Sequence, residues 1–179
     1  MLFRSLHELL QAVAMLRDRG VPAHVLLVGD GPERTRLEAL ARELGLRVHF
    51  EGACYDEARI GELTMACNVT VSPGKTGLTA VHSIGYGVPV VSHGDPDDQG
   101  PEWEAIIPGR TGSHFRRGDV ASLADAIEPW LRSPERDAEV RRACIDLVER
   151  LWNPRYQCRA IERAVCGAPA DDLMEGGAA

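Results

Sequence analysis

The chain has 179 residues, a length that suits one domain with a sizeable core, and its apolar residues (44%) are mostly aliphatic because only 5% of all residues are aromatic. Its formal net charge is −7 and it contains a single lysine, Lys75, which argues against a nucleic-acid backbone as the partner. The five cysteines include no C-x-x-C pair and no cluster with zinc-ligand spacing, so we predict reduced thiols in a cytoplasmic protein.

The hydrophobic pattern alternates helices with short buried strands. The first helix carries leucine and valine at helical spacing, and Gly20 and Pro22 end it. Arg4 and Glu8 interrupt the apolar pattern of this segment, so it is not a secretion signal, and no apolar run approaches the length of a membrane span. The predicted helices cover residues 6–16, 32–44, 57–66, 78–86, 120–131, 135–151 and 154–165, and the predicted strands cover residues 24–28, 48–50, 69–72, 88–92 and 111–115.

This alternation predicts an α/β fold, in which a Rossmann-like parallel sheet carries helices on both faces. We expect the domain to occupy residues 1–166, since the tail at residues 167–179 lacks an apolar pattern and is predicted to be disordered. Ligands of such sheets bind outside the carboxyl ends of the strands. Three loops lie at those ends, at residues 29–34, 72–78 and 92–102.

The most informative segment covers residues 72–93, which read as strand, glycine-broken loop, helix and second strand. The backbone N–H groups of residues 77–79 would open the helix, with Thr76 as its cap, and such groups favour the diphosphate of a sugar nucleotide. The alternative is an ordinary capped helix without a ligand. Lys75 either neutralises a phosphate oxygen or is a solvated loop lysine.

Further candidates lie in the other loops and inside the helix. Glycines in the turn at residues 29–31 permit close approach of a base or phosphate, although the same pattern also fits simple turn chemistry. His82, one turn into the helix, either bonds a ribose or sugar hydroxyl or bonds the backbone from a partly buried position. In the last loop, His93, Gln99 and Glu102 are candidates for sugar hydroxyls, and Glu102 alternatively stabilises a helix start.

The predicted substrate-binding residues share these three loops and the helix that follows the second one. They are Gly29, Asp30, Gly31, Ser72, Gly74, Lys75, Thr76, Gly77, Leu78, Thr79, His82, His93, Gln99 and Glu102. No catalytic residue and no metal site is assigned, because the clustered acids at residues 95–98 read as a solvated loop. The three tryptophans are predicted to be packing residues.

In this order and spacing, the loops resemble the C-terminal half of a retaining GT-B glycosyltransferase of the family 4 type. The resemblance covers roughly residues 1–150 and rests on VGDGPERTRLEALARELGL, VHFEG, VTVSP followed by GLTAVHSIGYGVPVV, GPEWEAI, and GRTG followed by LADAI. It implies a donor-binding domain for a nucleoside-diphosphate sugar, an acceptor-binding N-terminal domain, and retaining transfer without a metal or other cofactor. The variant SPG-x-x-GLTA-x-HS with Q-x-PE-x-EAI resembles a subgroup of bacterial surface-polysaccharide transferases.

The chain departs from that family pattern at two places. The resemblance implies two glutamates that contact the donor sugar and the ribose, but Gly74 and His82 stand at the matching positions. It also implies a first strand, an arginine and a lysine before the first helix, and this chain begins at the helix. The strand would lie between the strands at residues 24–28 and 69–72. Either those two strands pair directly, or another chain fills the slot, or the chain is part of a longer protein, which we favour.

The resulting functional prediction is the donor-binding half of a glycosyltransferase in polysaccharide or glycoconjugate synthesis, inactive without an acceptor domain. Whether the chain is an enzyme in its own right stays open. The alternatives are a non-catalytic nucleotide-binding module that completes a split glycosyltransferase, a ligand-free domain that dimerises through its open sheet, and an epimerase built on the same pair of half-domains. The sequence does not identify the base, the sugar or the acceptor.

Overall fold

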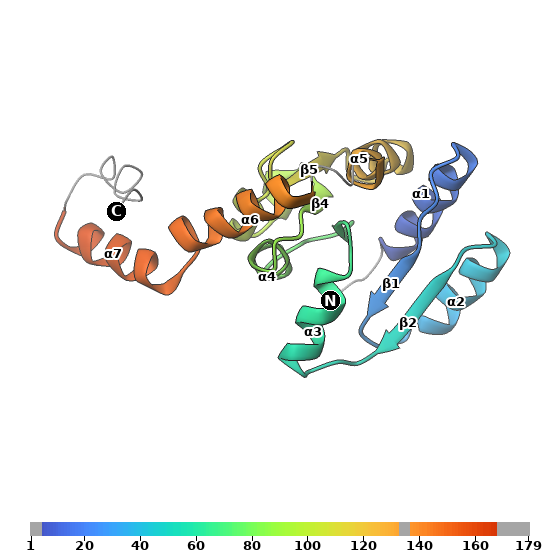
Figure 1. Cartoon of the computed structure of the whole chain (residues 1–179), viewed down its shortest axis with the longest axis horizontal. Helices are drawn as coiled ribbons and strands as arrows, with labels where there is room; N and C mark the ends of the chain where they lie inside the picture. The colour runs from blue at the N-terminus through green and yellow to red at the C-terminus, as the bar shows by residue number, and fades with distance from the viewer. Residues whose placement is uncertain (1–4, 133–136, 168–179) are drawn as a thin grey trace.

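The computed structural model describes residues 5–132 and 137–167 (Figure 1). Helices and strands alternate as the sequence predicts, and most bounds agree within two residues. The helix predicted from Pro32 instead begins at Arg34, after a turn. The elements in chain order are α1 (Leu6–Asp18), β1 (Val25–Val28), α2 (Arg34–Glu43), β2 (Val48–Gly52), α3 (Glu57–Met65), β3 (Thr70–Ser72), α4 (Thr79–Gly85), β4 (Val90–His93), the 3₁₀ turns η1 (Pro96–Asp98) and η2 (Pro101–Ala105), β5 (Gly112–Phe115), α5 (Val120–Arg132), α6 (Asp137–Leu151) and α7 (Pro154–Val165).

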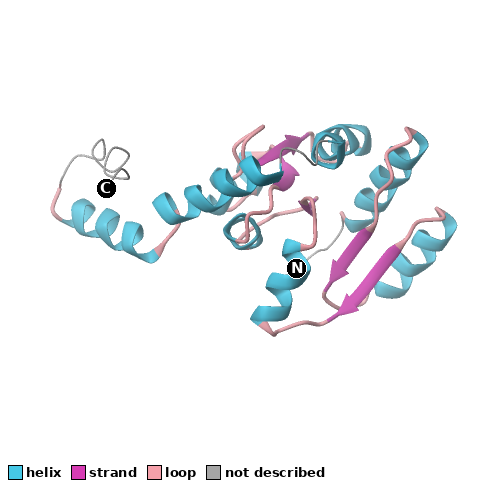
Figure 2. Ribbon diagram, in the orientation of Figure 1, coloured by secondary structure: helices cyan, strands magenta, loops and turns pink. Residues whose placement is uncertain are grey.

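The strands form two separate parallel sheets, one with the order β1-β2 and one with the order β3-β4-β5 (Figure 2). The predicted α/β fold with parallel strands is therefore confirmed, but the expected single sheet is divided. β1 and β3, the two strands on either side of the predicted gap, belong to different sheets. Direct pairing of these strands, one of the three alternatives raised by the sequence, is thus wrong. Among residues 5–132 and 137–167, each of the two strands pairs with a neighbour on one side only.

The larger core joins α1 and α5 to both sheets. Of the α1 leucines that recur at helical spacing, Leu6 is partly buried and the others are buried, and Leu10, Leu16 and the α5 residue Leu123 are fully buried. Each of these side chains contributes roughly 1.5–3 kcal/mol through its removal from water. The core is built from aliphatic side chains, as the composition predicts, with Phe115 as its buried aromatic residue among those described.

A second core lies on the other face of the three-stranded sheet. Val91 of β4 packs into the first core, whereas its neighbour Val90 packs with Ile84 of α4 and Leu147 of α6. Successive residues of a strand point to opposite faces, so α5 covers one face of this sheet and α4 with α6 covers the other. Cys144 is buried in this second core, and burial raises the pKa of its thiol to about 12. It is therefore an unreactive thiol.

Two local features fix the ends of elements. Asp56 caps α3 as predicted, because its carboxylate accepts a hydrogen bond from the Arg59 N–H at 3.1 Å. Asn153 caps α7 in the same way, because its side-chain oxygen accepts a hydrogen bond from the Tyr156 N–H at 3.0 Å. The sequence analysis did not predict this contact. None of the residues of α7 is buried, and Figure 1 shows this helix beyond α6, away from the sheets.

The predicted tail, apart from Gly167, lies outside the described residues, so its predicted disorder and the domain boundary at residue 166 stay predictions. Within residues 5–132 and 137–167, no helix has the length and apolarity that crossing a membrane requires.

Candidate functional site

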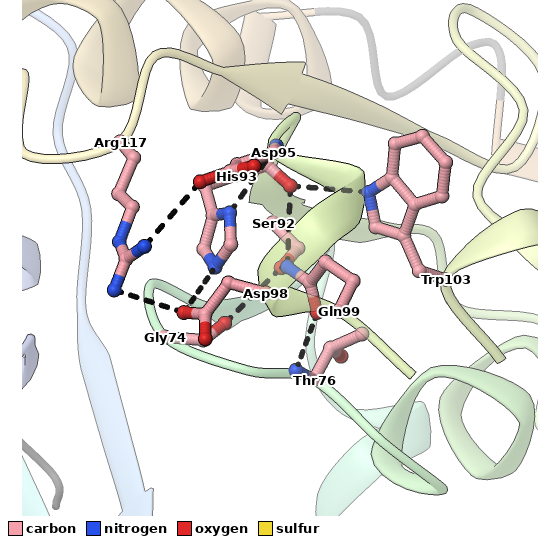
Figure 3. Close-up of polar contacts among 9 residues, drawn as sticks. All are labelled: Gly74, Thr76, Ser92, His93, Asp95, Asp98, Gln99, Trp103 and Arg117. Atoms are coloured by element: carbon pink, nitrogen blue, oxygen red, sulfur yellow. Dashed lines mark hydrogen bonds and ion pairs between the residues drawn. The ribbon is translucent and has the colours of Figure 1, made fainter. Parts of the chain in front are cut away.

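The carboxyl ends of β3, β4 and β5 lie in register, because Ser72 pairs with Ser92 and Ser92 pairs with His114. This register brings the loops that follow β3 and β4 side by side, as Figure 3 shows. The turn after β1 bonds elsewhere, since the Gly29 N–H donates to the Gly52 carbonyl at the end of β2, at 2.7 Å. Among the described residues, the hydrogen bonds of the site therefore join two of the three predicted loops.

Gln99 connects those two loops (Figure 3). Its carbonyl oxygen accepts a hydrogen bond from the Thr76 N–H at 3.0 Å, and its amide nitrogen donates to Ser92 Oγ at 2.9 Å and to the His93 carbonyl at 3.2 Å. Both donors of the amide and one of its acceptor sites are thus engaged within the protein. The structure shows Gln99 as a crosslink, and its predicted contact with a sugar hydroxyl stays a prediction.

Ser92 extends this crosslink and was not singled out from the sequence. Its hydroxyl is fully buried, accepts from Gln99 and donates to the Gly74 carbonyl at 3.3 Å. The loop after β3 is therefore fastened to the end of β4 at Gly74 and at Thr76. A serine in a buried strand cannot be recognised from the sequence as the residue that fastens a neighbouring loop, because this role depends on the strand register.

The predicted cap at Thr76 is wrong. The residue that precedes α4 is Leu78, and its side chain makes no capping hydrogen bond. Gly77 has φ 51°, in the left-handed region, and this turn separates Thr76 from the helix start. The Thr76 side chain is 4% exposed, and its Oγ1 is buried without a hydrogen-bond partner among the described residues.

His93 carries the second buried atom of this kind. The side chain is fully buried, and its Nδ1 accepts a hydrogen bond from the Asp95 N–H at 3.3 Å. The ring proton of the neutral imidazole is therefore on Nε2. This N–H has no hydrogen-bond partner in the described part of the chain, because the nearest carboxylate, Asp98 Oδ2, lies 4.0 Å away. An unpaired buried donor costs about 1–3 kcal/mol.

The charge state of His93 follows from its surroundings. Burial is the main cause that lowers the pKa of its imidazole, and the nearby positive charge of Arg117 lowers it further. The ring is therefore neutral at physiological pH and presents an N–H donor. The same burial effect lowers the pKa of His114, which stacks on Trp103 at 4.7 Å between ring centroids.

Arg117 holds the loop after β4 from the other side. Its guanidinium pairs with Asp95 at 3.3 Å and with Asp98 at 2.9 Å (Figure 3). Of the acids that the sequence analysis assigned to a solvated loop, Asp95 and Asp98 are half-exposed and ion-paired, whereas Asp97 is exposed. The sequence does not predict the role of Arg117, because nothing in it distinguishes Arg117 from the neighbouring Arg116. Arg116 pairs with Asp119 instead.

The other predicted residues occupy more exposed positions. Lys75 is exposed on the loop after β3, and Leu78 is 75% exposed at the start of α4. Glu102 lies in the first turn of η2, where Gly100 leaves room for its carboxylate, since a Cβ at Gly100 would lie 2.6 Å from Glu102 Oε2. The side chain of Asp30 accepts from the Gly31 N–H at 2.8 Å, as the turn alternative predicts.

His82 is not the partly buried, backbone-bonded histidine of the alternative interpretation. Its side chain is 58% exposed, and its Nε2 lies 3.2 Å from Glu57 Oε1 of α3. Trp103, predicted as a packing residue, packs against the second core and also donates its indole N–H to the His93 carbonyl at 3.0 Å. Within the described residues, no group of three or more His, Cys, Asp or Glu side chains is arranged to hold a metal ion.

Comparison with known proteins identifies the family. The family profile described as "Glycosyl transferases group 1" matches residues 4–146, which is more than half of the chain. Among curated relatives, the lipopolysaccharide core biosynthesis glycosyltransferase LpsE of Rhizobium meliloti is 34% identical over 70% of this chain and 35% of its own length. A GDP-mannose-dependent phosphatidylinositol dimannoside mannosyltransferase of Mycobacterium tuberculosis is 36% identical over 46% of this chain and 22% of its own length.

Solved structures agree with this assignment. The chain is similar to sucrose-phosphate synthase of Thermosynechococcus elongatus, with 27% identity and a TM-score of 0.73 over 93% of this chain and 43% of that one. It shares the fold of Anabaena Alr3699/HepE, solved in complex with UDP, with 22% identity and a TM-score of 0.73 over 92% of this chain and 46% of that one. The chain thus spans less than half the length of these relatives. The chain belongs to the family of glycosyl transferases group 1.

Proposed function

We propose that this chain is the donor-binding half of a glycosyltransferase, which transfers a sugar from a nucleoside-diphosphate sugar to an acceptor in polysaccharide or glycoconjugate synthesis. One observation carries the proposal: Thr76 Oγ1 and His93 Nε2 are buried polar atoms without a hydrogen-bond partner among the described residues. Thr76 lies in the loop after β3 and His93 is the last residue of β4, so both lie at the carboxyl ends of these strands, where parallel sheets bind their ligands. A bound donor nucleotide would satisfy both atoms.

The chemistry of the two atoms fits an oxygen-rich ligand. His93 is neutral and offers an N–H donor, and the Thr76 hydroxyl both donates and accepts. Their positions are fixed by Gln99, which ties the loop after β3 to the end of β4. Phosphate and sugar oxygens are acceptors for these donors. Because both atoms are buried, a ligand would reach them once the groups that cover them shift. The backbone N–H groups at residues 77–79 would supply further hydrogen-bond donors to the ligand, as the sequence predicts.

Several relatives support the donor class. HepE was solved with UDP, and the mycobacterial relative is named as GDP-mannose-dependent. LpsE is named for lipopolysaccharide core biosynthesis. These names also differ in the base and in the sugar, so the donor of this chain is proposed by class only. The cytoplasmic location inferred from the thiols stays a prediction.

The proposed activity needs an acceptor-binding domain. Transfer requires donor and acceptor to be held together, and the chain spans at most 46% of the relatives compared above. In the described part of the chain, the strands β1 and β3 each pair on one side only. A strand from the acceptor-bearing partner, from a longer version of the chain or from a second copy would pair there and relieve unsatisfied backbone groups. This observation also favours the second candidate function, a module that completes a split glycosyltransferase.

Isothermal titration calorimetry of the 179-residue chain with UDP, GDP and ADP tests the proposal. We expect one of these nucleotides to bind, and Thr76→Val to weaken that binding about tenfold, because one hydrogen bond to a charged oxygen is worth about 1.5 kcal/mol. Thr35→Val, which alters an exposed threonine in α2, is the matched control. Failure of all three nucleotides to bind would contradict the proposal.

A further inference from the structure

The carboxylate of Asp98 lies between a guanidinium and the buried imidazole of the candidate site. Its Oδ2 is 2.9 Å from Arg117 Nη2, and Arg117 also donates a hydrogen bond from Nη1 to Asp95 Oδ2 at 3.3 Å. The same Asp98 oxygen is 4.0 Å from His93 Nε2, the buried nitrogen without a hydrogen-bond partner among the described residues. One negative oxygen therefore faces a cation on one side and an unpaired N–H on the other (Figure 3).

Asp98 stands near His93 without satisfying it. A separation of 4.0 Å is too long for a hydrogen bond, so the ion pair with Arg117 is the contact that holds the carboxylate in this place. A ligand oxygen that accepts a hydrogen bond from His93 Nε2 has to come within about 3 Å of that nitrogen. Such an oxygen would come close to the carboxylate of Asp98, which is the nearest one to the ring.

A phosphate group and the Asp98 carboxylate do not fit this position together. Both are negative, and two like charges at such a distance repel each other, more strongly where water is excluded. For Arg117, however, the two groups are equivalent partners, because a guanidinium forms charge-assisted hydrogen bonds with carboxylate and phosphate oxygens alike. Arg117 can therefore exchange one anion for the other and stay paired.

The surroundings of Asp98 allow this exchange. Its side chain is 46% exposed, and none of the three residues of η1 is buried, so the carboxylate can turn into solvent without opening the core. Asp95 remains as a partner that keeps Arg117 in place. An open hollow of about 540 Å³ borders both Asp95 and Arg117, which leaves the guanidinium room to adjust. The crosslink made by Gln99 does not involve Asp98 and stays intact.

We infer that Asp98 is an internal competitor of the donor, whose carboxylate occupies, beside Arg117 and His93, the place that a phosphate group of the nucleoside diphosphate takes on binding. This inference rests on the proposed function. Binding breaks the ion pair between Asp98 and Arg117, and the phosphate then pairs with Arg117 and accepts the hydrogen bond of His93 Nε2. Arg117 touches the ligand, whereas Asp98 weakens its binding. This cation belongs to the loop after β5, outside the three loops from which the sequence predicted the site.

The test uses the two partners of one ion pair, which should shift nucleotide affinity in opposite directions. Calorimetry measures the dissociation constants of UDP, GDP and ADP for the wild-type chain, Asp98→Asn and Arg117→Ala. We expect Asp98→Asn to tighten the binding of the nucleotide that the wild type binds about threefold to fivefold, since it removes an exposed ion pair that has to break first. Arg117→Ala should weaken the binding about tenfold, the value of a hydrogen bond to a charged group.

Matched controls separate this effect from a change of overall charge. Asp97→Asn removes the same charge from the exposed neighbour of Asp98 in η1, and Arg116→Ala removes the exposed cation beside Arg117. Each control should change the dissociation constant less than twofold. Arg117→Lys keeps a cation and should bind within about threefold of the wild type. In the Arg117→Ala background, Asp98→Asn should add less than twofold, because the carboxylate is no longer held in place.

The outcomes distinguish the inference from a structural role and from the proposed function. Both variants break the same ion pair, so thermal unfolding without ligand should show similar small changes, and a merely structural pair would shift affinity in one direction only. If nucleotides bind but Asp98→Asn leaves the affinity unchanged or weakens it, the inference is wrong while the proposed function stands. The same holds if Arg117→Ala binds as well as the wild type or better. If no nucleotide binds the wild type, the proposed function fails and this inference fails with it.

Discussion

Replacement of Gln99 by leucine tests the crosslink between the two loops most sharply. The change keeps the size of the side chain and removes three hydrogen bonds, to the Thr76 N–H, Ser92 Oγ and the His93 carbonyl. Ser92 keeps its bond to Gly74, and the His93 carbonyl keeps its bond to Trp103, so these two losses are small. The Thr76 N–H is left without its acceptor.

The expected magnitude follows from these partners. An unpaired backbone N–H costs about 1–3 kcal/mol, and each of the two remaining bonds is worth about 0.5 kcal/mol when its partner stays otherwise satisfied. We expect Gln99→Leu to lower the free energy of unfolding by about 3 kcal/mol, which corresponds to a fall of roughly 6–12 °C in melting temperature for a chain of this size.

Urea unfolding and differential scanning calorimetry measure this effect. Gln157→Leu makes the same chemical change at an exposed position of α7 and serves as the control, with an expected change below about 0.5 kcal/mol. A Gln99→Leu variant that melts within about one degree of the wild type would refute the crosslink, since all three bonds would then be worth nothing.

Three further predictions concern pH, thiol chemistry and strand packing. Burial lowers the pKa of His93 and of His114 below 6.5, so the unfolded chain binds more protons in acid than the folded chain does. The free energy of unfolding is therefore full above pH 6.5 and falls as the pH drops toward the folded pKa values. Urea titrations from pH 8 to pH 5 should show a weaker pH dependence of this free energy for His93→Gln than for the wild type. Iodoacetamide should label the exposed Cys158 and Cys166 in the native chain but Cys144 only after unfolding, because burial raises the pKa of that thiol to about 12; native labelling of Cys144, read by mass spectrometry, contradicts the buried core. Gly112→Ala should prevent stable folding, since the new Cβ would lie 1.9 Å from the Val90 carbonyl oxygen, and a circular dichroism melt close to that of wild type would count against this close strand pairing.

The fold could be predicted largely because local signals agree with each other. The α1 leucines, the Asp56 cap and the run from β3 to β4 specify their elements within a few residues. The division into two sheets could not be derived from these signals. Strand pairing depends on which edges meet in space, and neither β1 nor β3 differs in composition from a strand that pairs on both sides.

The candidate site was predicted less completely, for a related reason. Loop position identified Thr76, His93 and Gln99, since they follow parallel strands. Their roles, however, depend on contacts between distant segments. Gln99 reaches back 23 residues to Thr76, and Arg117 reaches 22 residues to Asp95. No periodicity or spacing marks such contacts.

The most direct test of the account is a crystal structure of the chain with the nucleoside diphosphate or nucleotide sugar that it binds. The account predicts phosphate or sugar oxygens within about 3 Å of both Thr76 Oγ1 and His93 Nε2, two buried atoms without a hydrogen-bond partner among the described residues. A nucleotide that lies elsewhere and leaves both atoms unpaired would contradict it.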